Sequence, residues 1–219
     1  MITLLVDNKK LSVEAGTNLL QACLDHDIYI PNLCYIKGMD HPPASCRLCF
    51  VEIEGEDHPI PACTVQIRKE LVVKTDSPRV RLLQKTALQL LLSVHHVDCR
   101  NCPANRKCAL QDLSKFLKIG LKTKRFDLIL KQEQIDQNHP FLDYYPNRCV
   151  LCGRCVHVCL ERHDRALLTF AKRGFNTVIG FYENSDSPSI QCDTCRACIE
   201  VCPVAAILPK IPNSNIKIL

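Results

Sequence analysis

Cysteine is the residue type in this sequence with the greatest capacity for chemistry, since it occurs 16 times in 219 residues. Two runs share one spacing, Cys149-x2-Cys152-x2-Cys155-x3-Cys159 and Cys192-x2-Cys195-x2-Cys198-x3-Cys202. Three cysteines at this spacing can wrap three corners of a 4Fe–4S cube, and the fourth cannot reach back to the same cube. Soft thiolates favour iron–sulfur clusters over hard cations. We therefore expect two 4Fe–4S sites that exchange their fourth ligands.

The second run ends in Cys202-Pro203, which matches the run of bacterial two-cluster ferredoxins. The match predicts one site with the ligands Cys149, Cys152, Cys155 and Cys202. It predicts a second site with the ligands Cys192, Cys195, Cys198 and Cys159. The first run departs from the pattern, because Leu160 stands where proline is usual, and this leaves the local loop shape open. Two structural zinc sites are the alternative interpretation.

Two further groups have less familiar spacings. In Cys34-x11-Cys46-x2-Cys49-x13-Cys63, one close pair is flanked by two distant cysteines, as in a loop that holds a 2Fe–2S cluster. The plant-type spacing, however, has only four residues between the first two ligands. The other group is His95-x3-Cys99-x2-Cys102-x5-Cys108, which on its own fits zinc as readily as iron–sulfur.

The residues around these two groups resemble one family. Its members are the large peripheral-arm subunit of respiratory NADH dehydrogenase, the iron-only hydrogenases, and the small diaphorase subunit of NAD-reducing nickel–iron hydrogenases. The N-terminal 2Fe–2S domain of that family is similar to Ile30-Pro-Asn-Leu-Cys34-Tyr, Ser45-Cys46-Arg-Leu-Cys49 and Pro61-Ala-Cys63-Thr. The second group, followed by Ala109-Leu-Gln, resembles the family's His-plus-three-Cys 4Fe–4S site, and His95, not His96, has the family spacing.

The resemblance implies two further ligand sets. Cys34, Cys46, Cys49 and Cys63 would hold one 2Fe–2S cluster. His95, Cys99, Cys102 and Cys108 would hold a third 4Fe–4S cluster. Four clusters need sixteen ligands, and fifteen cysteines with His95 supply that number, so that Cys23 remains as a small buried hydrophobe.

The N-terminal segment has the pattern of two strands and a crossing helix. Met1–Val6 and Lys10–Val13 are expected to be strands joined by a turn at Asp7-Asn8. A helix should begin at Thr17 as N-cap, bury Leu19, Leu20, Cys23 and Leu24, and end before Pro31. Residues 50–54 and 71–74 are expected to be later strands. This is the outline of a β-grasp domain.

The remaining segments are assigned by composition and period. Val80–Val94 is expected to be a helix with Leu82, Leu83, Thr86, Leu90 and Val94 on its buried face, and Ala109–Leu117 a short helix. Phe126–Asn147 should be a connector, and Ile207 with Pro209–Leu219 an extended C-terminal arm. The basic residues Lys115, Lys118, Lys122, Lys124 and Arg125 form a solvated segment or a docking surface for an acidic partner.

Together these patterns predict an α+β chain of three cluster-binding parts. We expect a β-grasp 2Fe–2S ferredoxin domain at 1–79, a small helical 4Fe–4S domain with one histidine and three cysteine ligands at 80–119, a linker at 120–139, and a bacterial-type two-cluster ferredoxin domain at 140–219.

Composition and charge argue against several other classes of protein. The N-terminus lacks the charged and apolar regions of a signal peptide, and the cysteines fall in CxxC runs, so a secreted disulfide scaffold is disfavoured. No stretch approaches the roughly 18 apolar residues of a membrane span. Thiol ligands need a reducing compartment, and we expect the cytoplasm. The net charge of +5 does not imply nucleic acid, because thiolate-bound clusters lower it.

No motif for catalysis or nucleotide binding is present, since the sequence has neither a strand followed by GxGxxG nor a P-loop. We therefore predict no catalytic residue, with FMN and NAD(P) on a partner subunit only. The resemblance implies a flavoprotein NAD(P)H-binding subunit and hydrogenase small and large subunits as partners. The same relay in a formate dehydrogenase, an electron-bifurcating complex or a complex-I-like NADH dehydrogenase is an alternative, and a zinc-stabilised binding module is a remote one.

Overall fold

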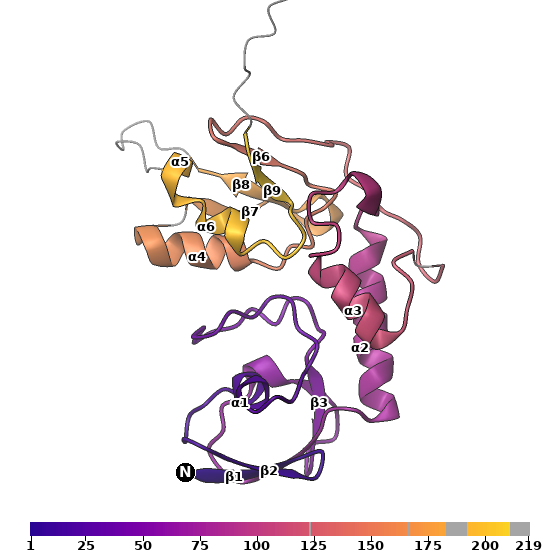
Figure 1. Ribbon diagram of the computed structural model, residues 1–219, viewed down its shortest axis with the longest axis vertical. Coiled ribbons are helices and arrows are strands. Elements are labelled where there is room, and N and C mark those ends of the chain that lie inside the picture. Colours follow the sequence, from indigo (N-terminus) through magenta and orange to yellow (C-terminus); the bar gives the residue numbers. More distant parts are fainter. Residues whose placement is uncertain (123, 166, 183–191, 211–219) are drawn as a thin grey trace, which may run out of the picture.

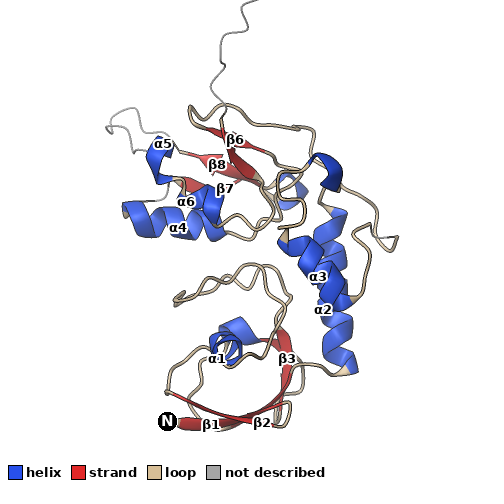
Figure 2. Cartoon of the chain, in the orientation of Figure 1, coloured by secondary structure: helices blue, strands red, loops and turns tan. Residues whose placement is uncertain are grey.

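The computed structural model describes residues 1–122, 124–165, 167–182 and 192–210. Three parts follow one another along the chain: an N-terminal unit with a sheet and one short helix, two helices along one side, and a C-terminal unit (Figure 1). Helices and strands are interspersed in the first and last parts (Figure 2), so the content is mixed α and β, as predicted.

The N-terminal unit is built on a five-stranded sheet in the order β2-β1-β5-β3-β4. The strands are β1 (Ile2–Val6), β2 (Lys9–Val13), β3 (Phe50–Ile53), β4 (Ile60–Pro61) and β5 (Leu71–Lys74). β1 pairs antiparallel with β2 and parallel with β5. Leu4 and Val6 alternate into the core because successive strand residues face opposite sides. Asp7 and Asn8 have φ values of 46° and 69°, the left-handed pair that a tight hairpin favours.

Helix α1 (Leu19–Asp25) packs its buried leucines into the same core as the sheet. Its N-cap is Asn18, whose side-chain oxygen accepts hydrogen bonds from the amides of Leu20 and Gln21 at 3.0 and 3.3 Å. The prediction of Thr17 as N-cap was therefore wrong by one residue. The helix also ends well before Pro31, because His26 caps it and Asp27 turns the chain with a φ of 60°.

The middle part consists of α2 (Pro78–Ser93) and α3 (Ala109–Leu117), which pack against each other. Ser77 caps α2 and Pro78 occupies its first position, where a missing amide hydrogen does no harm. The predicted bounds of α3 are confirmed.

The buried face of α2 is not the predicted one. Leu82 and Leu90 are 61% and 50% exposed, whereas Leu88 and Leu92 are almost completely buried. Gln84 is also fully buried, because its side-chain amide donates to the carbonyl oxygen of Phe50 in β3 at 3.2 Å. The helix thus packs against the N-terminal unit with the face that carries Gln84 and Leu88, and not with the face predicted from its leucines.

The C-terminal unit contains two small sheets and three helices in its described residues. In chain order these elements are β6 (Leu142–Tyr144), α4 (Arg154–His163), β7 (Leu168–Ala171), β8 (Val178–Phe181), α5 (Cys192–Cys195), α6 (Ala197–Glu200) and β9 (Ile207–Pro209). β7 and β8 form a hairpin, and β6 pairs antiparallel with β9. The predicted connector therefore contains a strand, and the predicted C-terminal arm begins as one. The arm beyond residue 210 lies outside the described residues.

Three short 3-10 turns complete the described elements: η1 (Ala62–Thr64), η2 (Cys99–Asn101) and η3 (Gly174–Asn176). Among the described residues, no helix has the length and apolar character that crossing a membrane requires.

Candidate metal centres

The first candidate centre gathers the four cysteines of the N-terminal unit from its loops. Cys34 follows α1, Cys46 and Cys49 precede β3, and Cys63 lies in η1; each is at most 4% exposed. The sulfurs of Cys34 and Cys46 are 3.4 Å apart. A hydrogen bond with Cys63, followed by burial, raises the pKa of Cys49. The residues predicted for the 2Fe–2S site are thus brought together.

Main-chain contacts hold this loop in place. The amide of Ala62 donates to the carbonyl oxygen of Cys49 at 2.8 Å, and the side-chain amide of Asn18 donates to that of Cys63 at 2.6 Å. Arg47 has a left-handed φ of 53°, which turns the loop between the two close cysteines. The N-cap of α1 therefore also positions a predicted ligand.

The second candidate centre lies beside α2 and α3. Cys99 begins η2, and Cys108 immediately precedes α3. Burial raises the pKa of Cys108, and the charges of Cys102 and Cys99 raise it further, so these three thiols are neighbours. His95, two residues beyond the end of α2, is 8% exposed.

The imidazole of His95 is held in one orientation. Its Nδ1 lies 2.9 Å from the carbonyl oxygen of Arg148, and because a carbonyl can only accept, Nδ1 carries the proton and donates. Burial, the largest cause, lowers the pKa of His95 and favours the neutral ring. The lone pair of Nε2 is then available to a metal, which is the arrangement expected of a ligating histidine.

The third candidate centre surrounds a cavity in the C-terminal unit. A small pocket in this unit is lined by all four residues of one predicted set, Cys149, Cys152, Cys155 and Cys202. Its other walls are mainly apolar, including Val150, Ile179 and Ile207. Cys202 therefore joins three cysteines of the first run although it lies 47 residues after Cys155.

Hydrogen-bond donors surround the sulfurs of this third set. The amide of Leu151 donates to Cys149 at 3.4 Å, and the amide of Ala206 donates to Cys202 at 3.2 Å. The hydroxyl of Tyr144, which is completely buried, bonds to Cys149 and lowers its pKa against the larger effect of burial. Such donors stabilise thiolates, so the chemistry of the site suits a buried anionic cluster.

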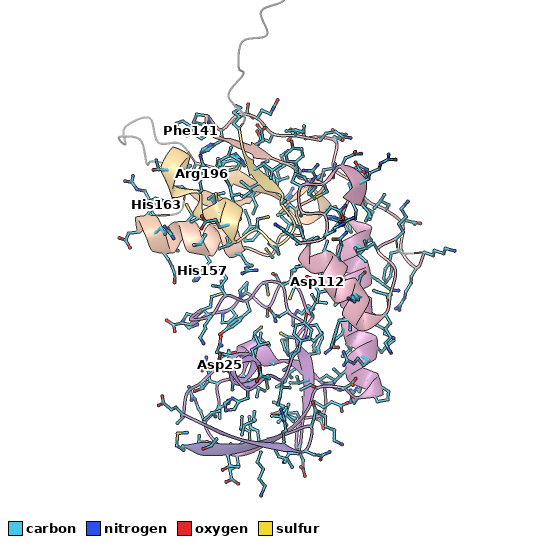
Figure 3. All side chains as sticks on the ribbon, viewed as in Figure 1. Asp25, Asp112, Phe141, His157, His163 and Arg196 are labelled. Atoms are coloured by element: carbon cyan, nitrogen blue, oxygen red, sulfur yellow. The ribbon has the colours of Figure 1, made fainter. Side chains whose placement is uncertain are left out.

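The fourth candidate centre lies between α4 and the short helices α5 and α6. Burial, followed by the charges of Cys159, Cys192 and Cys195, raises the pKa of Cys198 to about 12. This second predicted set is therefore also assembled from both runs. His163 extends from α4 toward this centre (Figure 3), and its Nε2 lies 3.5 Å from the sulfur of Cys195. α4 continues through Leu160 to His163, as a leucine permits and a proline would not.

Two predicted features stand apart from these centres. Cys23 is completely buried in the core of the N-terminal unit, where burial, followed by the charge of Asp7, raises its pKa to about 12. Its burial confirms the expectation that Cys23 is a small buried hydrophobe.

In the basic segment, Arg125 is held to α2 by hydrogen bonds to Thr86 and Gln89, at 3.0 and 3.4 Å.

Several contributing residues carry no pattern in the sequence. Tyr144 reaches Cys149 from β6, and Arg148 and Arg154 place guanidinium groups beside predicted ligands. The sequence signal that could have identified the two arginines is their position, since Arg148 lies one residue before Cys149 and Arg154 two residues after Cys152.

Within the described part of the chain, no three His, Cys, Asp or Glu residues form a group that could hold a single metal ion.

Three family models match the chain in succession. Residues 1–78 match a 2Fe–2S iron–sulfur cluster binding domain. Residues 84–121 match the NADH-ubiquinone oxidoreductase-G iron–sulfur binding region. Residues 139–208 match the ferredoxin-like domain of NADH-quinone oxidoreductase subunit 3. The chain therefore contains three iron–sulfur domains.

Curated relatives are similar over nearly all of the chain. The second NADH-quinone oxidoreductase G subunit of Rhizobium meliloti is 35% identical over 95% of this chain and 24% of its own length. The NADP-reducing hydrogenase subunit HndD of Solidesulfovibrio fructosivorans is 32% identical over 95% of this chain and 36% of its own length. The chain thus spans about a quarter to a third of these relatives.

A solved structure is also similar. It is a crystal structure of an NAD+-reducing NiFe hydrogenase in the H2-reduced state, and the match covers 96% of this chain and 88% of that chain. The TM-score is 0.83 and the sequence identity 28%. The arrangement of the three parts is therefore shared with a chain of that enzyme.

Proposed function

This chain is homologous over nearly all of its length to part of the G subunits of NADH-quinone oxidoreductases and to part of an NADP-reducing hydrogenase subunit, and on that premise we propose that it is a multi-cluster electron-transfer subunit. It relays electrons between a flavin- and NAD(P)H-binding subunit and the catalytic module of a NiFe hydrogenase. The observation that carries the relay is the third centre, where residues from two distant runs surround one cavity.

The proposal includes a finer assignment of folds and domain bounds. Residues 1–79 form a β-grasp 2Fe–2S ferredoxin domain, and 80–119 a small helical 4Fe–4S domain with one histidine and three cysteine ligands. Residues 120–139 link this domain to a two-cluster ferredoxin domain at 140–219. Support comes from the sheet crossed by α1, the α2–α3 pair, and the two interleaved cysteine runs.

The proposal assigns ligands for one 2Fe–2S and three 4Fe–4S clusters. The ligand sets are Cys34, Cys46, Cys49 and Cys63; His95, Cys99, Cys102 and Cys108; Cys149, Cys152, Cys155 and Cys202; and Cys192, Cys195, Cys198 and Cys159. Bound clusters supply reversible one-electron oxidation and reduction. The chain's own residues hold the thiols at buried or half-buried positions in loops and short helices, and they direct amide and hydroxyl donors at the sulfurs of Cys149 and Cys202.

The proposal places the substrate chemistry on partner subunits. FMN and NAD(P) bind the flavoprotein partner, the hydrogenase subunits handle hydrogen, and this chain contributes no catalytic residue. The likeness to a chain of an NAD+-reducing NiFe hydrogenase supports this choice of complex. We also propose a cytoplasmic location, where thiol ligands remain reduced.

A complex-I-like NADH dehydrogenase is the second candidate, because an NADH-quinone oxidoreductase G subunit is 35% identical to this chain. A formate dehydrogenase or an electron-bifurcating complex would use the same relay. The matches to three iron–sulfur families do not favour the zinc-stabilised binding module.

Anaerobic purification followed by metal analysis tests the relay. We expect about fourteen iron and about fourteen sulfide per chain, from one two-iron and three four-iron clusters. About four zinc per chain without labile sulfide would contradict the proposal. Tagged purification from the native host then tests the complex, since a nickel-containing partner supports the hydrogenase and a quinone-reactive partner supports the alternative.

A further inference from the structure

Two buried guanidinium atoms next to the predicted ligands have no partner in the described structure. They are Nη1 of Arg148 and Nε of Arg154, and neither makes a hydrogen bond there. No ion pair of either arginine is found among the described residues. Both residues are half-buried, and a buried donor atom without a partner is unfavourable, so we expect an acceptor or a negative group beside each of these two atoms.

The main chain of Arg148 contacts the second centre, and its side chain packs on a neighbouring tyrosine. Its carbonyl oxygen accepts the Nδ1 hydrogen bond of His95 at 2.9 Å. Its guanidinium stacks on the ring of Tyr145, with 4.1 Å between the guanidinium carbon and the ring centroid. The hydrogen bond to its carbonyl oxygen therefore holds Arg148 directly beside the predicted ligand His95.

Arg154 acts on the third centre from the first position of α4. Gly153 before it has a left-handed φ of 77°, a conformation in which a residue with a side chain would be strained. Arg154 lies two residues after Cys152 and one residue before Cys155, so it is close along the chain to two predicted ligands of the third centre.

We propose that Arg148 and Arg154 are counter-charges for two neighbouring clusters, and that each raises the reduction potential of the site beside it. Arg148 serves the site with His95, and Arg154 serves the site with Cys149, Cys152, Cys155 and Cys202. The inference rests on the proposed function, since it requires clusters at both sites. Reduction adds negative charge, so a fixed positive charge in a low-dielectric interior stabilises the reduced state more than the oxidised state.

The test compares charge-removing with charge-keeping variants of the anaerobically loaded chain. Arg148→Gln and Arg154→Gln remove the charge, whereas Arg148→Lys and Arg154→Lys keep it. Redox titration followed by electron paramagnetic resonance reads each site separately. We expect Arg148→Gln to decrease the equilibrium constant for reducing the His95 site about tenfold, which is about 59 mV for one electron. Arg154→Gln should do the same at the third centre.

Controls separate charge from packing. Each Lys variant should stay within about threefold of the wild type, or about 28 mV at 59 mV per tenfold. Neither Gln variant should shift the Cys34 site. Tyr145→Leu removes the surface on which Arg148 stacks but keeps its charge, and should leave the His95 site within the same limit.

Each outcome decides the inference. Loaded clusters with unchanged potentials in both Gln variants would overturn it while leaving the proposed function intact. If a Gln variant fails to hold iron, a Lys variant that holds it at the wild-type potential supports the counter-charge, and a Lys variant that also fails overturns it. A wild-type chain without iron and sulfide would instead overturn the proposed function.

Discussion

Ala109 and Pro203 are joined by a hydrogen bond of 3.0 Å between the amide of the first and the carbonyl oxygen of the second. Each residue directly follows a predicted ligand, Cys108 in the middle part and Cys202 in the C-terminal unit. The amide of His96 also donates to the carbonyl oxygen of Asn147 at 2.7 Å. The segment from His96 to Ala109 is thus fixed at both ends to the C-terminal unit. These bonds keep the predicted site of His95 and the predicted site of Cys202 at a constant separation. Because electron tunnelling falls steeply with distance, a fixed separation would keep the rate of transfer between clusters at these sites steady.

Replacing His95 with cysteine should lower the reduction potential of its site. A thiolate adds a negative charge where the imidazole is neutral, and that charge disfavours the reduced cluster. His95→Cys should therefore shift one titration signal to lower potential and leave the others in place. An unchanged titration of a fully loaded variant would show that His95 is not a ligand.

The interleaving of the two C-terminal runs can be tested by matching lost signals. Cys202→Ala should lose the same 4Fe–4S signal as Cys152→Ala, with about four fewer iron atoms per chain. Cys159→Ala should lose the other signal, which it shares with Cys195→Ala. Electron paramagnetic resonance and iron analysis of the four variants check this. If Cys202→Ala instead matched Cys195→Ala, each run would bind its own cluster.

The N-cap of α1 should contribute more to stability than its neighbour. Asn18→Ala removes two capping hydrogen bonds and one bond to Cys63, and should lower the free energy of unfolding by ~1–2 kcal/mol. Thr17→Ala is the matched control and should stay within about 0.5 kcal/mol. Denaturant titration under anaerobic conditions measures both. Equal losses would contradict the assignment of the cap to Asn18.

The two leucine faces of α2 should respond differently to truncation. Leu88 is completely buried, so Leu88→Ala should cost ~2–5 kcal/mol through lost burial and a cavity. Leu82 is 61% exposed, and Leu82→Ala should change the stability by less than about 0.5 kcal/mol. The measurement is the midpoint of unfolding of the chain on its own. A larger loss for Leu82→Ala would support the face expected from the sequence.

The sequence predicted those features that depend on local spacing. Cysteine intervals predicted the two interleaved C-terminal sets, and the family resemblance implied the sets of Cys34 and His95. The sets containing Cys34, Cys149 and Cys198 are brought together in the structure, as are Cys99, Cys102 and Cys108. Iron binding by these sets stays a prediction. The sequence also predicted strand β1 from its alternating apolar residues and helix α3 from its helical spacing of apolar residues, because each of these patterns lies within a single element.

Features that depend on contacts between distant parts of the chain could not be predicted from the sequence. α2 carries leucines on more than one face, and its buried face is selected by the contact between Gln84 and Phe50. Thr17 and Asn18 are both good N-caps, and the bond to Cys63, 45 residues away, accompanies the choice of Asn18. Tyr144, Arg148 and Arg154 gain their roles only when the chain folds around the sulfurs.

The pairing of β6 with β9 has a consequence for biosynthesis. Leu142 lies opposite Pro209, and Cys202 lines the same cavity as Cys149, so this pocket is closed by residues translated near the end of the C-terminal unit. While the ribosome is still short of Cys202, the emerging polypeptide presents an incomplete set of thiols. If a cluster binds here, its fourth predicted ligand becomes available only after Cys202 has left the ribosome.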